Sequence, residues 1–270
     1  MVLEQFQNDT ADFADILLPA TTFLEHTDLY TAYGHYFLQL ARPALPAPGE
    51  TKSNFEVFQL LAKRMGLEDP CLFESEDEMI RGLLASGHSH LEGITLERLE
   101  TEHFVRLNIP SPYLPFAEGG FGGPEGKAQL GTAGLTYAPP PESRLGDENR
   151  TYPLELISPK AHDAMNSTFS NQPALDAETG VAWLHSTDAA VRGITNGDEV
   201  RLFNDRGEVR MRAAVDGKTA PGVVAVPAVR WPKRSAGRAG VNTLITDRLT
   251  DLGGGATFYS CLIQVERCAE

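Results

Sequence analysis

The chain has 270 residues, with 37 acidic and 23 basic side chains and a formal net charge of −14. Such a length accommodates one or two domains with a sizeable core. The negative charge argues against binding nucleic acid or an anionic membrane through a general electrostatic field. It does not exclude a local basic pocket that binds a small anion.

The sequence predicts neither a membrane-spanning helix nor an export signal. It has no run of about 20 apolar residues, and Met-Val-Leu-Glu-Gln-Phe at its start lacks the basic and apolar regions of a signal peptide. The three cysteines, Cys71, Cys261 and Cys268, form no CxxC pair and fit neither a zinc site nor an iron–sulfur cluster. We therefore expect a reducing, cytoplasmic location.

The first third of the chain is predicted to mix strands and helices. The apolar run Ile16-Leu17-Leu18 is typical of a buried parallel strand, and Val2-Leu3 of the end of another strand. Two capping boxes, Ser53 to Glu56 and Ser75 to Glu78, each predict the start of a helix with one apolar face. From Pro110 to Arg150, proline and glycine clusters predict a long irregular connection.

The second half has the shorter period of β-structure. Its predicted strands are 152–157, 199–203, 208–215, 222–227 and 257–265, with a short helix at 187–193. Asn204-Asp205-Arg206-Gly207 is a predicted hairpin turn with a glycine available for positive φ. Short strands, glycine turns and a single small helix favour a closed barrel over a doubly wound sheet.

The loop after strand 152–157 is rich in groups that bind polar ligands. Pro159 ends the strand because it has no N–H for the ladder. The loop then supplies an ammonium, an imidazole, amides and hydroxyls, from Lys160, His162, Asn166, Ser167, Thr168, Ser170 and Asn171. Loops with many donors often hold phosphates and heterocycle edges. The alternative, which local composition alone favours, is a turn-rich surface connection.

Three later stretches are also candidate ligand contacts. Arg230 to Arg234, with Arg238, concentrates positive charge as phosphates require, or forms a solvated loop. Asn242-Thr243 offers an amide and a hydroxyl, and the glycine run at 253–255 lets the backbone approach a ligand or simply turns the chain. An independent hydrolase has little support, because no nucleophile elbow or HExxH motif is present. His162 and Asp163, adjacent in sequence, are expected to point apart.

Four segments in order resemble the molybdopterin-dependent oxidoreductases of the dimethyl sulfoxide reductase superfamily. They are Thr10 to Pro19 with Glu25, Ser158 to Asn171, Asp188 to Val200, and the closing series Gly222-Val223-Val224, Asn242-Thr243-Leu244 and Gly253 to Val265. Each motif alone has low specificity, and the order and spacing carry the resemblance. The match covers most of residues 1–70 and 150–268.

The resemblance implies two domains. Residues 1–105 would be the last part of a Rossmann-like α/β domain, 106–150 a linker, and 151–270 an all-β double-psi β-barrel that binds a molybdopterin guanine dinucleotide carrying molybdenum or tungsten. The implied cofactor contacts are Ser158, Lys160, His162, Asn166, Ser167, Thr168, Asn242, Thr243, Thr257, Phe258 and Tyr259. Asp198 is interpreted as a structural turn residue, and no metal ligand or catalytic residue is assigned.

The chain also departs from that family. Full-length members carry an iron–sulfur cysteine motif and a cysteine, selenocysteine or serine ligand to the metal, and this sequence has neither. We therefore do not expect it to be active alone, and expect an N-terminal catalytic portion or subunit as its partner. The alternative is a stand-alone double-psi barrel that serves as a binding module without redox activity.

Overall fold

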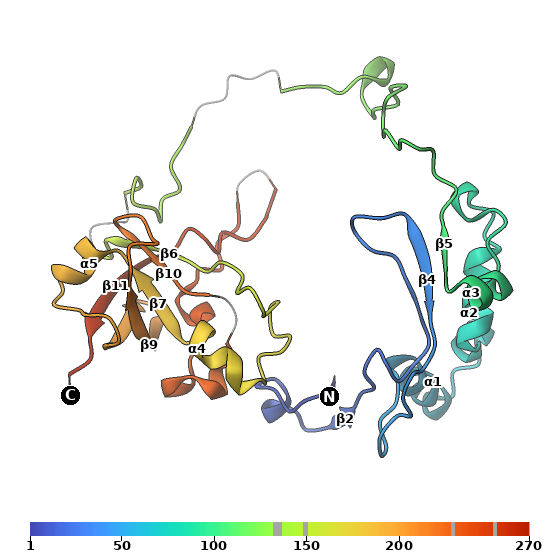
Figure 1. Ribbon diagram of the computed structural model, residues 1–270, viewed down its shortest axis with the longest axis horizontal. Coiled ribbons are helices and arrows are strands. Elements are labelled where there is room, and N and C mark those ends of the chain that lie inside the picture. Colours follow the sequence, from blue (N-terminus) through green and yellow to red (C-terminus); the bar gives the residue numbers. More distant parts are fainter. Residues whose placement is uncertain (132–136, 148–150, 228–229, 251–252, 270) are drawn as a thin grey trace. The chain divides into compact units, whose positions relative to one another are not determined.

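The computed structural model describes residues 1–131, 137–147, 151–227, 230–250 and 253–269. The chain divides into two compact units, residues 1–134 and 135–270, and each has its own hydrophobic core (Figure 1). The division between the units falls inside the connection predicted from the proline and glycine clusters. The first unit mixes helices and strands, and the second is built around a β-barrel.

A parallel pair of strands begins the first unit. Strand β1 (Val2–Glu4) pairs with β2 (Leu17–Pro19), with Val2 opposite Leu17. The predicted parallel arrangement is therefore confirmed, whereas the expected burial of the apolar run is wrong. The Ile16 and Leu17 side chains are 54% and 44% exposed, because the two-stranded sheet gives this run no neighbour beyond β1.

The sequence did not predict the second, antiparallel sheet of this unit. It has the order β3-β4-β5 and consists of β3 (Asp28–Tyr30), β4 (Phe37–Ala41) and β5 (Phe104–Arg106). Two of these strands have only three residues, too few for an alternating pattern to be recognised. Leu38, Leu99 and Val105 pack with Ile94 in the core beside this sheet.

The capping boxes set the starts of two helices as predicted. They open α1 (Asn54–Met65) and α2 (Glu76–Leu84), and a third helix, α3 (Leu96–Glu102), was not predicted. The Glu56 N–H donates to the Ser53 hydroxyl at 3.1 Å, and the Ser53 N–H donates back to the Glu56 carboxylate at 3.2 Å. Each box satisfies backbone N–H groups that the first turn of a helix leaves without partners.

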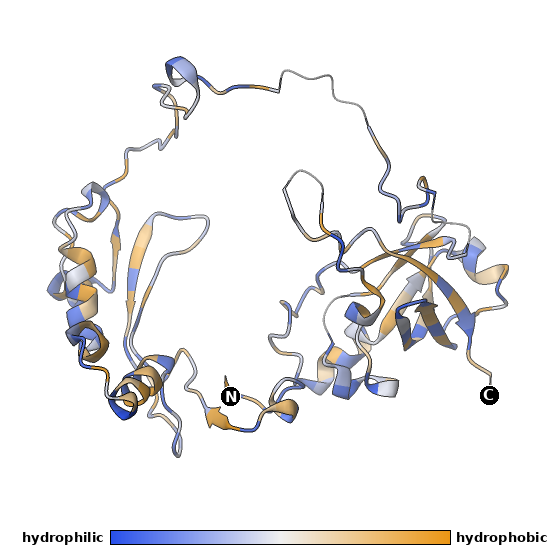
Figure 2. Cartoon of the chain, turned by 180° about the vertical axis from the view of Figure 1, so that it is seen from behind, coloured by the Kyte–Doolittle hydropathy of each residue, from blue (hydrophilic) through white to orange (hydrophobic). Residues whose placement is uncertain are grey.

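The apolar face of α1 remains largely uncovered within the first unit. Of the helix residues, only Ala62 is buried, while Phe58 and Met65 are 59% and 65% exposed. Hydrophobic colours run along this helix as they do along the strands of the barrel (Figure 2). Exposed apolar side chains gathered on one helix face are typical of a surface that contacts a protein, a ligand or a membrane.

The second unit contains a closed barrel of six strands in the order β10-β6-β11-β8-β9-β7. The strands are β6 (Leu154–Ile157), β7 (Val181–Leu184), β8 (Glu199–Asn204), β9 (Gly207–Val215), β10 (Val223–Ala225) and β11 (Leu262–Arg267). The β6–β10 and β7–β9 pairs are parallel and the other four are antiparallel. Two short helices, α4 (Asp176–Thr179) and α5 (Ser186–Ala190), lie between β6 and β8 in the chain. The predicted barrel is confirmed.

Alternating side chains fill the barrel interior. Along β8, Val200 and Leu202 are fully buried while Arg201 between them is partly exposed, and β9 alternates in the same way from Val209 to Ala213. Alternation follows from the pleat, which points successive side chains to opposite faces. Barrel closure leaves the strands no free edge, so this core is shielded along its whole circumference.

The sequence analysis missed one strand of the barrel, and two of its local predictions are wrong. Strand β7 was not predicted, and β11 begins at Leu262 instead of Thr257, because Thr257 accepts the Ser260 N–H in a turn. Gly207 does not have a positive φ. The absence of a side chain is what matters at this position, because a Cβ there would lie 2.5 Å from the Thr243 methyl group.

Within the described residues, no helix combines the length and apolar character needed to cross a membrane.

Truncating Val209 tests the barrel core against an exposed control of the same chemistry. Val209 is 1% exposed and Val191 is 79% exposed. Val209→Ala is expected to lower the free energy of unfolding by about 2–3 kcal/mol through lost burial and a residual cavity. Val191→Ala is expected to change it by less than about 0.5 kcal/mol. Equal losses in urea titrations of the two variants would contradict this core.

Candidate functional site

The donor-rich loop begins where β6 ends. Ser158 is buried at the end of the strand, and Pro159 follows it. The implied contacts beyond it, Lys160, His162, Asn166, Ser167 and Thr168, are all exposed. The loop therefore presents its ammonium, imidazole, amide and hydroxyls to solvent from a fixed, buried base.

Two contacts shape the loop internally. The Lys160 ammonium donates to the Asn166 side-chain oxygen, and the Ser170 hydroxyl donates to the Asn166 carbonyl at 3.4 Å. Asn166 itself has φ of +55°, in the left-handed region that asparagine adopts more readily than most residues. The cation and the amide are thus held side by side, which suits a ligand that has both a negative charge and hydrogen-bonding edges.

His162 and Asp163 do not point apart, so that expectation is wrong. The His162 Nδ1 atom lies 2.7 Å from the Asp163 carboxylate, and the His162 N–H donates to Glu178 at 2.8 Å. The hydrogen bond with Asp163, and then its charge, raise the pKa of His162 above its ordinary value. The imidazole is therefore charged over a wider pH range, and the Asp163 carboxylate partly neutralises that charge.

The loop before β11 meets the loop after β6. The Tyr259 hydroxyl donates to the Ser158 carbonyl at 3.3 Å, although the two residues are 101 positions apart. Tyr259 and Phe258 pack edge to face with ring centroids 4.5 Å apart, and both are about half exposed. Thr257 is held by a bond from its hydroxyl to the Arg248 carbonyl at 2.8 Å. The structure therefore brings these two predicted groups of residues together.

Asn242 and Thr243 occupy a separate turn. They lie in the 3₁₀ turn Val241–Leu244, whose two end residues are buried while the two middle residues are exposed. Among the described residues, neither side chain forms a hydrogen bond with the other predicted contacts. The burial of Val241 and Leu244 at the two ends of the turn fixes the position of Asn242 and Thr243.

The positively charged loop has a structural role that the sequence did not reveal. Arg234 and Arg230 both pair with Asp176 on α4, at 2.5 and 3.4 Å. A hydrogen bond from Arg234, and then the charges of Arg230 and Arg234, lower the pKa of Asp176. These two arginines are thus partly neutralised and are weaker candidates for phosphate contacts. Trp231, between them, donates its indole N–H to the Ser167 carbonyl at 3.2 Å.

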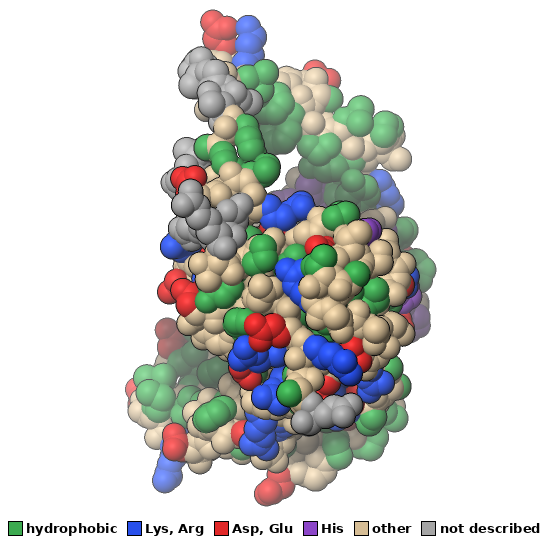
Figure 3. Space-filling model, turned by 90° about the vertical axis from the view of Figure 1, so that its left-hand side faces the viewer, with side chains coloured by type: hydrophobic (Ala, Val, Ile, Leu, Met, Phe, Trp, Pro, Cys, Tyr) green, Lys and Arg blue, Asp and Glu red, His purple; other side chains and the backbone are tan. Residues whose placement is uncertain are grey.

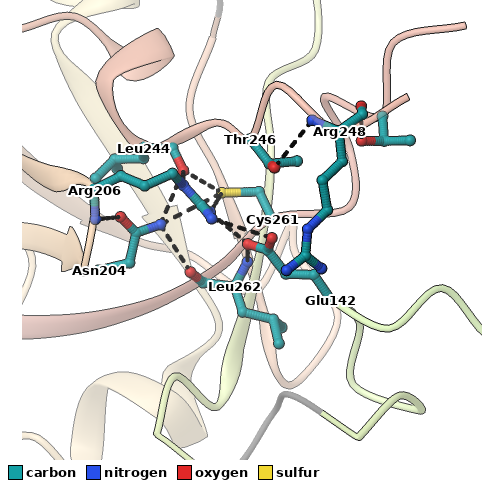
Figure 4. A network of polar contacts seen from close by, with 9 residues as sticks. Glu142, Asn204, Arg206, Leu244, Thr246, Arg248, Cys261 and Leu262 are labelled. Atoms are coloured by element: carbon teal, nitrogen blue, oxygen red, sulfur yellow. Dashed lines mark hydrogen bonds and ion pairs between the residues drawn. The ribbon is translucent and has the colours of Figure 1, made fainter. Parts of the chain in front are cut away.

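Sequence reasoning missed a buried polar network under the later loops (Figure 4). Glu142, whose side chain is 7% exposed, pairs with Arg206 at 2.5 Å and accepts the Leu262 N–H at 2.9 Å. Asn204 donates to the Leu244 and Leu262 carbonyls at 2.9 and 3.1 Å. The only signal in the sequence was the hairpin turn, because Glu142 belongs to a segment interpreted as linker.

A cleft of about 590 Å³ is lined in part by the positively charged loop and lies away from the loops before β11 and after β6. Arg210, Met211 and Arg212 of β9 line it, together with Asp176 and Arg230, and none of the residues implied as cofactor contacts does. Its walls carry both signs of charge, from Asp176, Glu199, Arg210, Arg212 and Arg230. Figure 3 shows that basic and acidic side chains are interspersed on one face of the chain. We give more weight to the loops, because their donors are exposed and belong to segments that contact one another.

No metal centre is visible in the described part of the chain, where no three His, Cys, Asp or Glu side chains gather closely enough to hold an ion. Asp198 behaves as a turn residue: its carboxylate accepts the Thr195 N–H at 2.8 Å and the Thr195 hydroxyl at 2.9 Å.

The buried thiol of Cys261 leads us to expect that the stability of the chain depends on pH. Burial, and then the charge of Glu142, raise the pKa of the Cys261 thiol from 9.0 to about 11. Between these two values the unfolded chain loses this proton and the folded chain keeps it. The free energy of unfolding is therefore expected to fall by about 2–3 kcal/mol from this group as the pH rises through that window.

Urea titrations across this pH range check the expectation. Cys261→Ala should flatten the decline, whereas Val191→Ala, at an exposed position without a titratable side chain, should leave it unchanged. An identical slope in parent and Cys261→Ala would show that Cys261 is not the group responsible.

Comparison with known proteins identifies both parts of the chain. Residues 1–64 match the family model described as molybdopterin oxidoreductase, and residues 154–262 match the one described as molydopterin dinucleotide binding domain. The probable oxidoreductase YoaE of Bacillus subtilis is 37% identical over 99% of this chain, which spans 40% of that relative. The dimethyl sulfoxide reductase DmsA of Escherichia coli is 29% identical over 99% of this chain and 37% of its own length.

A solved structure shares the fold. Acetylene hydratase from Pelobacter acetylenicus superposes with a TM-score of 0.78 at 23% identity, over 98% of this chain and 40% of that one. It fits the double-psi form of the barrel and a mixed α/β first unit. The chain thus spans about 40% of the length of the relatives it matches. It belongs to the molybdopterin oxidoreductases of the dimethyl sulfoxide reductase superfamily.

Proposed function

We propose that the barrel binds and positions a molybdopterin guanine dinucleotide as part of a larger molybdenum or tungsten oxidoreductase. The observation that carries the proposal is the meeting of two loops at Tyr259 and Ser158, on a barrel that matches the dinucleotide-binding domain. One loop offers charged and amide donors and the other offers exposed aromatic rings. Phosphates and heterocycles require those two kinds of group.

The donor set fits such a cofactor. Lys160 and His162 supply positive charge, and Asn166, Ser167 and Thr168 supply hydrogen bonds, all from one exposed loop. Asn242 and Thr243 add an amide and a hydroxyl from a second turn. When bound, the cofactor supplies the redox chemistry, and the residues of this chain bind and orient it.

GDP provides a direct test, because it contains the guanine and diphosphate of the proposed ligand. Lys160→Ala removes a cation that Asn166 holds in place, and is expected to weaken GDP binding by about tenfold. Lys127→Ala, which removes an exposed lysine from the connecting segment, should bind GDP as the parent does. Calorimetry on the full chain measures both, and raising the salt concentration should weaken binding further.

Two results would contradict the proposal. The first is a parent chain that shows no binding of GDP in the calorimetric titration. The second is an equal loss of affinity in the Lys160 and Lys127 variants, which would mean that only the overall charge matters.

We further propose that the partner is an N-terminal portion or subunit that carries the metal ligand and an iron–sulfur cluster. Two observations support this: the chain spans about 40% of its relatives, and α1 leaves Phe58 and Met65 exposed. The exposed apolar face would then be covered by the remainder of the α/β domain, with burial of each side chain stabilising the contact by about 1.5–3 kcal/mol.

Copurification tests the partner. The part of the Bacillus subtilis relative outside the segment matched here is the probe, expressed together with this chain. We expect it to copurify with the parent and with a Lys63→Gln, Arg64→Gln control on the same helix. Phe58→Gln with Met65→Gln should abolish copurification, because amides replace the apolar contact. Retention by that double variant would show that the α1 face is not the contact surface.

A further inference from the structure

The carbonyl group of Leu244 is an unusually well-coordinated point in the barrel unit. It accepts from Arg206 Nε at 2.7 Å, from Asn204 Nδ2 at 2.9 Å and from the Cys261 thiol at 3.1 Å (Figure 4). Leu244 is fully buried and ends the 3₁₀ turn that carries Asn242. Three donors on one carbonyl fix the position and orientation of that turn relative to the barrel.

The same side chains also hold the start of β11. The Leu262 N–H donates to Glu142 at 2.9 Å, and the Leu262 carbonyl accepts from Asn204 at 3.1 Å. Arg206 pairs with Glu142 and so connects the two ends of the network. Leu262 comes three residues after Tyr259. Both later candidate loops are therefore fixed near their bases by a single group of side chains.

We propose that Arg206 is a positioning residue that holds the Asn242–Thr243 turn and the Thr257–Tyr259 segment in place for the dinucleotide. The inference rests on the proposed function. The guanidinium suits this role because its planar set of donors reaches the Leu244 carbonyl and the Glu142 carboxylate at the same time. A lysine at this position provides one point charge and cannot make both contacts in fixed directions.

A second ion pair in the same segment provides a control that distinguishes the positioning of the later loops from the attachment of residues 142–144 to the barrel. Arg144, two residues after Glu142, pairs with Glu155 on β6 at 2.7 Å and donates to the Pro221 carbonyl at 2.8 Å. It attaches the same segment to the barrel through β6 and through Pro221, two residues before β10, and these two contacts reach neither the Leu244 carbonyl nor the Leu262 backbone. Arg144→Lys is therefore a matched control for Arg206→Lys, with the same change of side chain and the same net charge.

Cys261 reports the state of the network without any ligand. It is fully buried, and its thiol donates to the Leu244 carbonyl. In the 270-residue chain carrying Cys71→Ser and Cys268→Ser, it is the single thiol, and its alkylation by iodoacetamide can be followed by mass spectrometry. Loosening of the loop bases exposes the thiol and lowers the cost of forming the reactive thiolate.

The experiment measures GDP affinity and Cys261 alkylation in the parent, Arg206→Lys and Arg144→Lys chains. We expect Arg206→Lys to bind GDP about tenfold more weakly and to be alkylated several times faster, while Arg144→Lys matches the parent in both. Unchanged values in Arg206→Lys, or equal changes in the two variants, would overturn the proposal.

Failure of the proposed function gives a different pattern. If the parent does not bind GDP, the cofactor role is contradicted, and the alkylation rates alone decide whether Arg206 positions the loops. If Arg206→Lys does not fold by circular dichroism, Glu142→Gln takes its place, because the amide keeps an acceptor for the Leu262 N–H and removes the charge that pairs with Arg206. Parent-like values in that variant would overturn the proposal.

Discussion

The pairing of β10 with β7 closes the barrel, and the rest of the second unit depends on it. Val224 lies opposite Leu184 and Ala225 opposite Trp183, so two short strands remove the last free edges of the sheet. Without that pairing, the fully buried side chains at 154, 184, 200 and 224 would face water. The closed wall also fixes where each strand ends, and therefore where each candidate loop begins.

Long segments with a clear pattern were predictable from the sequence, and short ones were not. The alternation from Glu199 to Val215 and the two capping boxes each combine several residues in one signal, and the structure confirms them. The three-residue strands and β7 lack such redundancy. Their positions are set by pairing with distant strands, as Val181 pairs with Arg212, and a local pattern cannot contain that information.

The candidate site shows the same division. The chemistry of the loop after β6 was recognisable from its residue types, because donors can be counted in a sequence. The contacts that shape it were not, as the Tyr259 bond to Ser158 and the capture of Arg230 and Arg234 by Asp176 illustrate. Charge in a sequence thus overstates the charge available to a ligand wherever the fold supplies a counterion.

The anchoring of residues 142–144 to the barrel bears on which residues an isolated second domain would need. The sequence placed its first residue at 151, and the matched domain model begins at 154. A chain cut at either point would keep all six strands and lose Glu142, leaving the partly buried Arg206 guanidinium without its carboxylate and the Leu262 N–H without its acceptor. Removing one partner of a buried ion pair is costly. The minimal autonomous barrel therefore includes a stretch of apparently featureless chain that contributes no strand and completes its interior.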